Sequence, residues 1–285
     1  MRNEALNGYL LHQRPYQEKR ALYYLFSEHL GIVHGIGKKG APLFEPLQLF
    51  ATGKRDLKTF SQITISPIDV SQLDESFTLN NVISSDIVSN DSSQATNSAP
   101  QVLAPQPQRY QQITGQQQYA ALYLNEILLK LLPVEDPTPV LWHHYQHSLL
   151  TLKRSLSADE LRLCLRQFEH NLFQELGFAL NLTQDSMLDN IDAESSYRFL
   201  PDIGLVPIIQ HPDIQHNTIQ NMDQVENTNL QAVFKGREIL AMEHSGITIA
   251  TLNSWSRLCK HLIDHLVDYQ PLQSRLLWQQ QQRYQ

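Results

Sequence analysis

The sequence predicts an α+β protein in which a small antiparallel β-barrel at the N-terminus is followed by a helical domain. Residues 8–40 contain three short apolar segments separated by Arg14-Pro15 and by Gly31, a pattern typical of a strand meander. Residues 84–118 are rich in Ser, Asn, Gln and Pro, which indicates a break in the fold. Beyond this break, apolar residues recur at helical spacing.

The three N-terminal segments, residues 9–12, 21–27 and 32–36, are expected to be strands because aromatic and β-branched residues fill them. Residues 17–30 contain neither Pro nor Gly, so by composition a helix remains an alternative there. Residues 47–51 and 57–65, joined by a turn, are expected to form a hairpin that continues the sheet.

Basic residues gather near the loops of this predicted barrel, which makes it a candidate platform for single-stranded nucleic acid. The first group consists of Arg14, Lys19, Arg20, Lys38 and Lys39. Lys54, Arg55 and Lys58 lie at the hairpin tip, where they are either a solvated turn or a second basic loop on the same barrel. The whole chain has a net charge of −7, but residues 1–60 hold nine Lys or Arg against five Asp or Glu. A phosphate backbone responds to local potential, so a basic N-terminal face can still bind it.

We expect the barrel to occupy residues 1–75, an insertion or linker residues 76–118, and the helical domain residues 119–285. The segment 84–118 has too few large apolar side chains to offset the entropy lost on ordering, so we expect it to be flexible. Within the helical domain, residues 183–232 show little periodicity and are expected to be irregular, with short strands near 197–199 and 205–209.

Four helices are expected in the C-terminal part, over residues 119–132, 140–152, 161–176 and 249–269. Ser157 and Glu160 form the Ser-x-x-Glu pattern of a capping box before the third helix, and Gly177 fits the position just after its end. The tail after Pro271 is polar and is expected to be partly frayed.

Two groups of side chains on these helices have both a structural and a functional interpretation. His143 and His147 have the i,i+4 spacing of two metal ligands, but no carboxylate or cysteine follows nearby, so polar-face histidines are the favoured reading. Arg162 and Arg166 lie one turn apart beside an apolar stripe. They form either a structural ion pair with an acid such as Glu169 or a cationic clamp for an acidic peptide end.

Several classes of protein are not indicated. No apolar run is long enough to span a membrane, and the N-terminus lacks the pattern of a secretory signal, so a cytoplasmic protein is expected. Cys164 and Cys259 are the only cysteines and form no metal-binding motif. Phosphate-binding loops and the common nucleophile and zinc-protease motifs are absent from the sequence, which favours binding over catalysis; no cofactor and no metal are expected.

Five parts of the sequence together match a known family. They are GYLLHQRPYQE at 8–18, LFSE at 25–28, YLNEIL at 123–128, LRQFE at 165–169 with ELGF at 175–178, and QPLQSR at 270–275. These segments are spread over about half of the chain and occur in the order found in the bacterial RecO family of recombination mediators, which the chain therefore resembles.

This resemblance implies an N-terminal OB-fold barrel and a helical domain. It also implies binding of single-stranded and double-stranded DNA, strand annealing, contact with the acidic C-terminal tail of single-strand-binding protein, and cooperation with RecR in loading RecA. By its place in the Leu-Arg-x-Phe-Glu segment, Arg166 resembles the arginine that meets this tail; Arg162 is added from helix geometry. This role also implies that the protein associates with the nucleoid.

The chain departs from the family pattern in three ways. Many members carry a four-cysteine zinc module after the Gly-Phe segment, whereas residues 183–232 contain no cysteine. The basic stretch at Lys38-Lys39 is shorter than is usual in the family, and the insertion at 84–118 has no counterpart. An alternative function is therefore a protein-binding adaptor with an OB-like barrel that does not bind nucleic acid.

Overall fold

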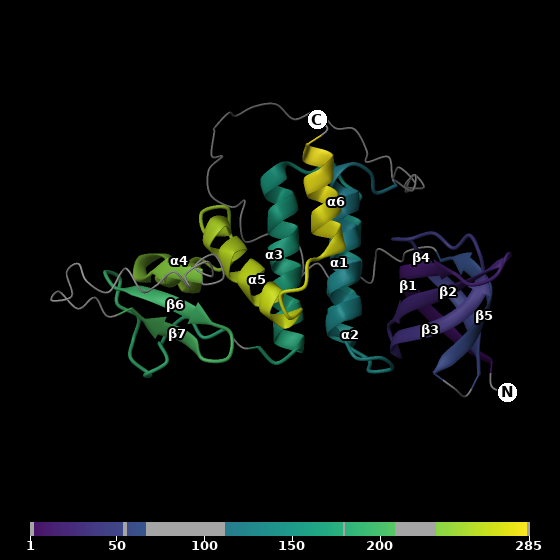
Figure 1. Cartoon of the computed structure of the whole chain (residues 1–285), viewed down its shortest axis with the longest axis horizontal. Helices are drawn as coiled ribbons and strands as arrows, with labels where there is room; N and C mark the ends of the chain where they lie inside the picture. Colours follow the sequence, from purple (N-terminus) through teal and green to yellow (C-terminus); the bar gives the residue numbers. More distant parts are fainter. Residues whose placement is uncertain (1–2, 54–55, 67–111, 179, 209–231, 284–285) are drawn as a thin grey trace, which may run out of the picture. The chain divides into compact units, whose positions relative to one another are not determined.

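The computed structural model describes residues 3–53, 56–66, 112–178, 180–208 and 232–283. Within these residues the N-terminal part is a closed five-stranded barrel with the order β1-β2-β3-β5-β4 (Figure 1). Its strands are β1 Asn3–Pro15, β2 Arg20–Ser27, β3 Gly31–Lys38, β4 Pro46–Thr52 and β5 Leu57–Ile65. This strand order, closed by a parallel pairing of β3 with β5, is that of the OB fold, so the predicted fold class is confirmed.

The segment that the sequence left open between helix and strand forms β2. It pairs with β1 on one side and β3 on the other, and Ala21, Tyr23 and Leu25 point into the barrel core. Local composition allowed either structure, and the pairing of β2 on both sides decided for the strand. Because Gly35 of β3 has no side chain, the Phe60 ring of β5 can pack directly against it. A Cβ at this position would lie 2.5 Å from that ring.

The helical part begins with α1 Gln116–Leu131, α2 Pro139–Leu152 and α3 Ala158–Glu175 and ends with α5 Leu252–Leu266 and α6 Gln273–Gln282. The predicted capping box is confirmed: the Ser157 side chain accepts from the Glu160 N–H, and the Glu160 carboxylate accepts from the Ser157 N–H. The tail that was expected to be partly frayed instead forms α6, which lies beside α1 (Figure 1). The prediction missed α6 because its contacts are with residues far away in the sequence.

Glu126 of α1 explains why α6 begins where it does. Its carboxylate accepts hydrogen bonds from the backbone N–H groups of Gln273 and Ser274, both at 2.8 Å, and from the Ser274 hydroxyl at 2.7 Å. A helix has unpaired N–H groups in its first turn, and a carboxylate is a favoured acceptor for them.

The barrel and the helices share a hydrophobic core. Tyr9, Phe26 and Ile32 lie on barrel strands but are buried with Tyr145 and other helical residues. Asn125 of α1 joins the two parts, because its amide donates to the Leu11 carbonyl at 2.9 Å and accepts from the Tyr145 hydroxyl at 2.6 Å.

A three-stranded sheet with the order β7-β6-β8 forms in and just after the segment 183–232, which was expected to be irregular with short strands. The strands are β6 Ser196–Leu200, β7 Gly204–Pro207 and β8 Ala232–Lys235, and α4 Gly236–Ser245 follows directly. Strands near 197–199 and 205–209 were expected, whereas β8 and α4 were not. The expected flexible insertion at 84–118 lies mostly outside the described residues, and α1 begins at its end.

None of the helices in the described ranges is both long and apolar enough to cross a membrane.

Candidate nucleic-acid and peptide-binding sites

Five of the predicted basic residues gather at one end of the barrel, and we call them the cationic rim. The group consists of Arg14, Lys19, Arg20, Lys38 and Lys39, all of them exposed. Arg20 and Lys38 are cross-strand partners on β2 and β3. The backbone N–H of Lys39 donates to the Lys19 carbonyl at 3.1 Å, and the Lys39 ammonium donates to the Glu18 carbonyl at 2.9 Å.

Arg14 joins the rim because β1 runs to the same end of the barrel as the start of β2. Its guanidinium carbon lies 5.7 Å from the centre of the Tyr24 ring, within the range of a cation–π contact. A hollow of about 500 Å³ opens beside Lys38 and Lys39, and its other walls are the following loop, Leu47 of β4 and part of β5. Among the described residues, none of the ion pairs involves a side chain of the cationic rim, so phosphate groups of a polyanion can approach this end of the barrel without displacing one of them.

The predicted second basic loop is not brought to the rim as far as the structure describes it. Lys58 lies opposite Gly35 in the β3–β5 pairing, and its ammonium is 2.7 Å from the Glu135 carboxylate in the loop between α1 and α2. Only 15% of the Lys58 side chain is exposed. Lys54 and Arg55 lie outside the described residues.

A second candidate site is a largely apolar hollow of about 210 Å³ between α1, α3 and α6, here called the α1–α3–α6 hollow. Its apolar lining comes from Tyr119, Ala120, Tyr123, Leu161, Leu165 and Trp278. Leu161 and Leu165 of α3 line this hollow and are half-buried. Arg162, Arg166 and Arg275 line it as well, so positive charge flanks the apolar surface.

Arg162 is the most accessible of these arginines, with 41% of its side chain exposed. Its guanidinium donates to the side-chain oxygen of Asn253 at 2.7 Å and to the Ser256 hydroxyl at 3.3 Å, both on α5. These neutral acceptors hold the side chain without cancelling its charge. The Asp159 carboxylate, 3.3 Å away, is itself more than half exposed.

Arg166 pairs with Glu169, as the structural interpretation predicts, and it also lines the hollow. The guanidinium lies 2.7 Å from the Glu169 carboxylate, which is fully buried. Burial alone would lower the pKa of Arg166, but the negative charges of Glu169 and its neighbours raise it, so the side chain stays charged.

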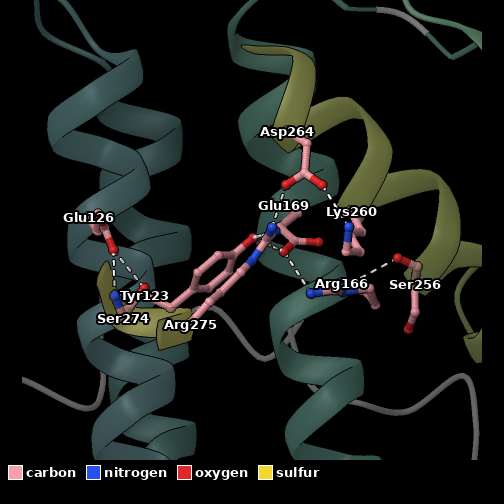
Figure 2. A network of polar contacts seen from close by, with 9 residues as sticks. All are labelled: Tyr123, Glu126, Arg166, Glu169, Ser256, Lys260, Asp264, Ser274 and Arg275. Carbon is pink, nitrogen blue, oxygen red and sulfur yellow. Dashed lines mark hydrogen bonds and ion pairs between the residues drawn. The ribbon is translucent and has the colours of Figure 1, made fainter. Parts of the chain in front are cut away.

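Arg275 was missed as a site residue, although it lies in the QPLQSR segment that carries part of the family resemblance. Figure 2 shows Arg275 reaching from α6 past Tyr123 to Asp264 of α5. Its guanidinium carbon lies 5.3 Å from the centre of the Tyr123 ring. Tyr123 in turn donates to Glu169, so Arg275 and Arg166 belong to one polar network.

The histidines of α2 do not form a metal site in the part of the chain that the structure describes. No three His, Cys, Asp or Glu side chains of those residues are arranged to hold a metal ion. Burial lowers the pKa of His144 and of His147, which favours their neutral forms.

These features define a class of protein: an OB-type barrel with an exposed cationic rim, continued into a helical bundle that carries an apolar hollow flanked by arginines. Residues 114–208 match the family model described as "Recombination protein O C terminal". The chain is 28% identical over 279 residues to the DNA repair protein RecO of Stutzerimonas stutzeri, covering 95% of this chain and 92% of the relative. It is 30% identical over 208 residues to that of Pseudomonas paraeruginosa, covering 71% and 70%. The chain belongs to the RecO family of DNA repair proteins.

Proposed function

We propose that this protein acts in DNA repair and recombination as a mediator. In this role it binds single-stranded and double-stranded DNA, promotes annealing of complementary strands and, with RecR, promotes loading of RecA onto DNA coated by single-strand-binding protein. It acts by binding, without a catalytic step of its own, in the cytoplasm at the nucleoid. Family membership supports the repair role. The two candidate sites support a DNA-binding region on the barrel and a separate partner-binding region on the helices.

DNA binding is assigned to the cationic rim, and the gathering of its five exposed side chains is the observation that carries the proposal. Lys and Arg side chains bind the phosphate backbone, which is the same in every DNA sequence. Each such contact releases counterions into solution, and this release favours binding. The rim supplies enough charge for a local attraction despite the net charge of −7. Lys54, Arg55 and Lys58 are proposed as further contacts, with Lys58 first releasing Glu135.

Partner capture is assigned to the α1–α3–α6 hollow. A flexible chain end that carries both carboxylates and an apolar side chain matches its lining, since the arginines can form charge-assisted hydrogen bonds while the apolar group is buried. The acidic C-terminal tail of single-strand-binding protein is the proposed ligand, bound by Arg162 and Arg166 with Arg275 beside them. Holding this tail raises the effective concentration of the barrel on coated DNA.

The test is fluorescence anisotropy with a labelled single-stranded oligonucleotide and with its duplex at low salt, with and without single-strand-binding protein. We expect both DNA forms to bind directly, with affinity that falls steeply as salt is added. If the protein joins the complex solely when single-strand-binding protein coats the strand, the adaptor without DNA binding is the correct function. Association that does not respond to salt would also contradict binding by the rim.

A further inference from the structure

Three rings form a row across the outward face of β1, β2 and β3. The ring centres of His12 and Tyr24 lie 5.6 Å apart, and those of Tyr24 and His34 lie 4.6 Å apart. The β1–β2 register shifts between Leu10 and His12, so Leu11 is an extra residue that turns into the shared core while His12 comes opposite Tyr24. Tyr24 and His34 are direct partners in the β2–β3 pairing.

This row lies between an apolar border and the cationic rim. On one side the next cross-strand pair, Phe26 and Ile32, is buried in the core shared with the helices. On the other side the pair Leu22 and Ile36 is half-buried, and beyond it the pair Arg20 and Lys38 is exposed. Cross-strand partners share one face of a sheet, so rings, apolar side chains and cations follow one another in that order.

The charges around the row favour a polyanion. Residues 12–14, 20–24 and 34–38, which supply this face, contain no Asp or Glu. Arg14 lies over the Tyr24 ring. Glu135, which approaches His34, is already paired with Lys58.

The two histidines are suited to stacking. Burial and the charge of Arg14 lower the pKa of His12, and burial lowers the pKa of His34, so both rings are neutral at neutral pH. A neutral imidazole presents a flat face to a nucleobase, as a tyrosine ring does. Bases stack on such rings regardless of sequence, because every base has a π-face.

We infer that His12, Tyr24 and His34 form a base-stacking surface for single-stranded DNA, with the phosphates of the same strand lying on the cationic rim. This inference rests on the proposed DNA binding by the barrel and adds to it a preference for single-stranded over double-stranded DNA. The bases of a duplex are stacked on one another and are not available to the row, whereas the phosphates of both forms are available to the rim. The row therefore favours the unpaired strand.

The first experiment needs no variant of the protein. A labelled oligothymidylate is compared with an abasic oligonucleotide of equal length, which keeps the phosphates and lacks the bases, and with a duplex of that length. We expect the wild-type protein to bind oligothymidylate about tenfold more tightly than the abasic strand, as loss of a base–aromatic contact would give. Equal affinity for the two single strands would overturn the inference.

The second experiment removes the central ring. Tyr24→Leu is expected to weaken binding of oligothymidylate about tenfold and to leave the abasic strand and the duplex within about twofold of wild type. Tyr24→Phe keeps the ring and is expected to restore the affinity. His12→Ala, at an exposed position, is also expected to weaken binding of oligothymidylate, but by less than Tyr24→Leu does.

A matched control is available on the helical part. Tyr269 also packs against a histidine, His265, with ring centres 6.2 Å apart, and it is 48% exposed. Tyr269→Leu should leave all three affinities unchanged. If Tyr24→Leu weakens all three ligands equally, the row is structural and the inference fails while DNA binding by the rim stands. If the wild-type protein binds none of the three at low salt, the proposed function itself fails.

Discussion

Arg166 and Glu169 form an ion pair at 2.7 Å whose carboxylate is fully buried, and the same carboxylate accepts a hydrogen bond from Tyr123 of α1. Arg166 thus both lines the α1–α3–α6 hollow and neutralises a charge inside the helical bundle. The proposed peptide binding and the stability of the bundle therefore both depend on this one residue, so each variant of it requires both measurements.

Arg166→Ala is expected to weaken binding of an acidic tail peptide by about 1–3 kcal/mol, the cost of losing a hydrogen bond to a charged group. It is also expected to lower the free energy of unfolding by about 3 kcal/mol, because Glu169 is left buried without its partner. Isothermal titration calorimetry gives the first value and urea unfolding gives the second. A dissociation constant that stays the same in the folded variant would make Arg166 purely structural.

Arg162→Ala separates the two effects, because this side chain is held at the surface by neutral acceptors and an exposed carboxylate. We expect weaker peptide binding with a change in unfolding free energy below about 1 kcal/mol, as for exposed ion pairs. Arg237→Ala is the control, since Arg237 on α4 is also an exposed arginine with an exposed acidic neighbour, Glu194. Equal peptide affinities for the two variants would remove Arg162 from the site.

Substitutions in the cationic rim are expected to change the salt dependence of DNA binding. Each phosphate contact to single-stranded DNA contributes about 0.7 to the slope of log affinity against log salt concentration. Lys38→Ala and Arg20→Ala should each reduce the slope by about this amount. Lys260→Ala, which removes a lysine paired with Asp264 on α5, should leave the slope unchanged.

Asn125→Asp is expected to destabilise the protein although it changes a single group. The Asn125 amide donates to the Leu11 carbonyl, and a carboxylate at this place would instead repel that oxygen. We expect a loss of about 2 kcal/mol or more in unfolding free energy, because buried polar groups lose their partners. At Asn181 the side-chain oxygen accepts from Thr183 and Gln184, a role that Asp can fill, so Asn181→Asp should be tolerated.

The two cysteines are expected to be inert in the folded protein. Burial raises the pKa of the Cys164 thiol to about 12 and also raises that of Cys259, so the reactive thiolate is disfavoured at neutral pH. A thiol-alkylating reagent followed by mass spectrometry should label neither residue in native protein and both after denaturation. Rapid native labelling would contradict the burial of these side chains. The unfolded chain loses its thiol protons at a lower pH than the folded protein does. We therefore also expect the free energy of unfolding to fall as the pH rises from 9.0, the ordinary thiol pKa, toward the raised value of about 12 for Cys164.

The parts of the fold that sequence predicted best are those fixed by local patterns. Ser157 and Glu160 lie three residues apart, so their capping box is visible in the chain itself. The strands of the barrel were found because Pro15 and Gly31 separate short apolar runs. Arg162 and Arg166 were singled out because they lie one turn apart beside the apolar stripe of α3, whereas the role proposed for Arg166 came from the family resemblance.

The parts that were missed depend on contacts between distant residues. The position of Arg275 depends on Glu126, because this carboxylate fixes the start of α6. The polar sequence after Pro271 does not by itself predict that contact. The row of His12, Tyr24 and His34 depends on the cross-strand register and on the extra residue Leu11 in β1. Glu169 reads as a surface acid on α3, and its burial follows from Tyr123 and Arg166 closing over it.

The core that joins the barrel to the helices sets a limit on how this protein can be divided. Tyr9, Leu11, Phe26 and Ile32 belong to the barrel by sequence but are covered by helical side chains such as Trp142 and Tyr145. A fragment that ends after β5 would present these apolar groups to water and leave the Leu11 carbonyl without the Asn125 amide. The barrel therefore cannot be studied as an isolated module, and loss of the helical side chains that cover these groups will destabilise the barrel as well.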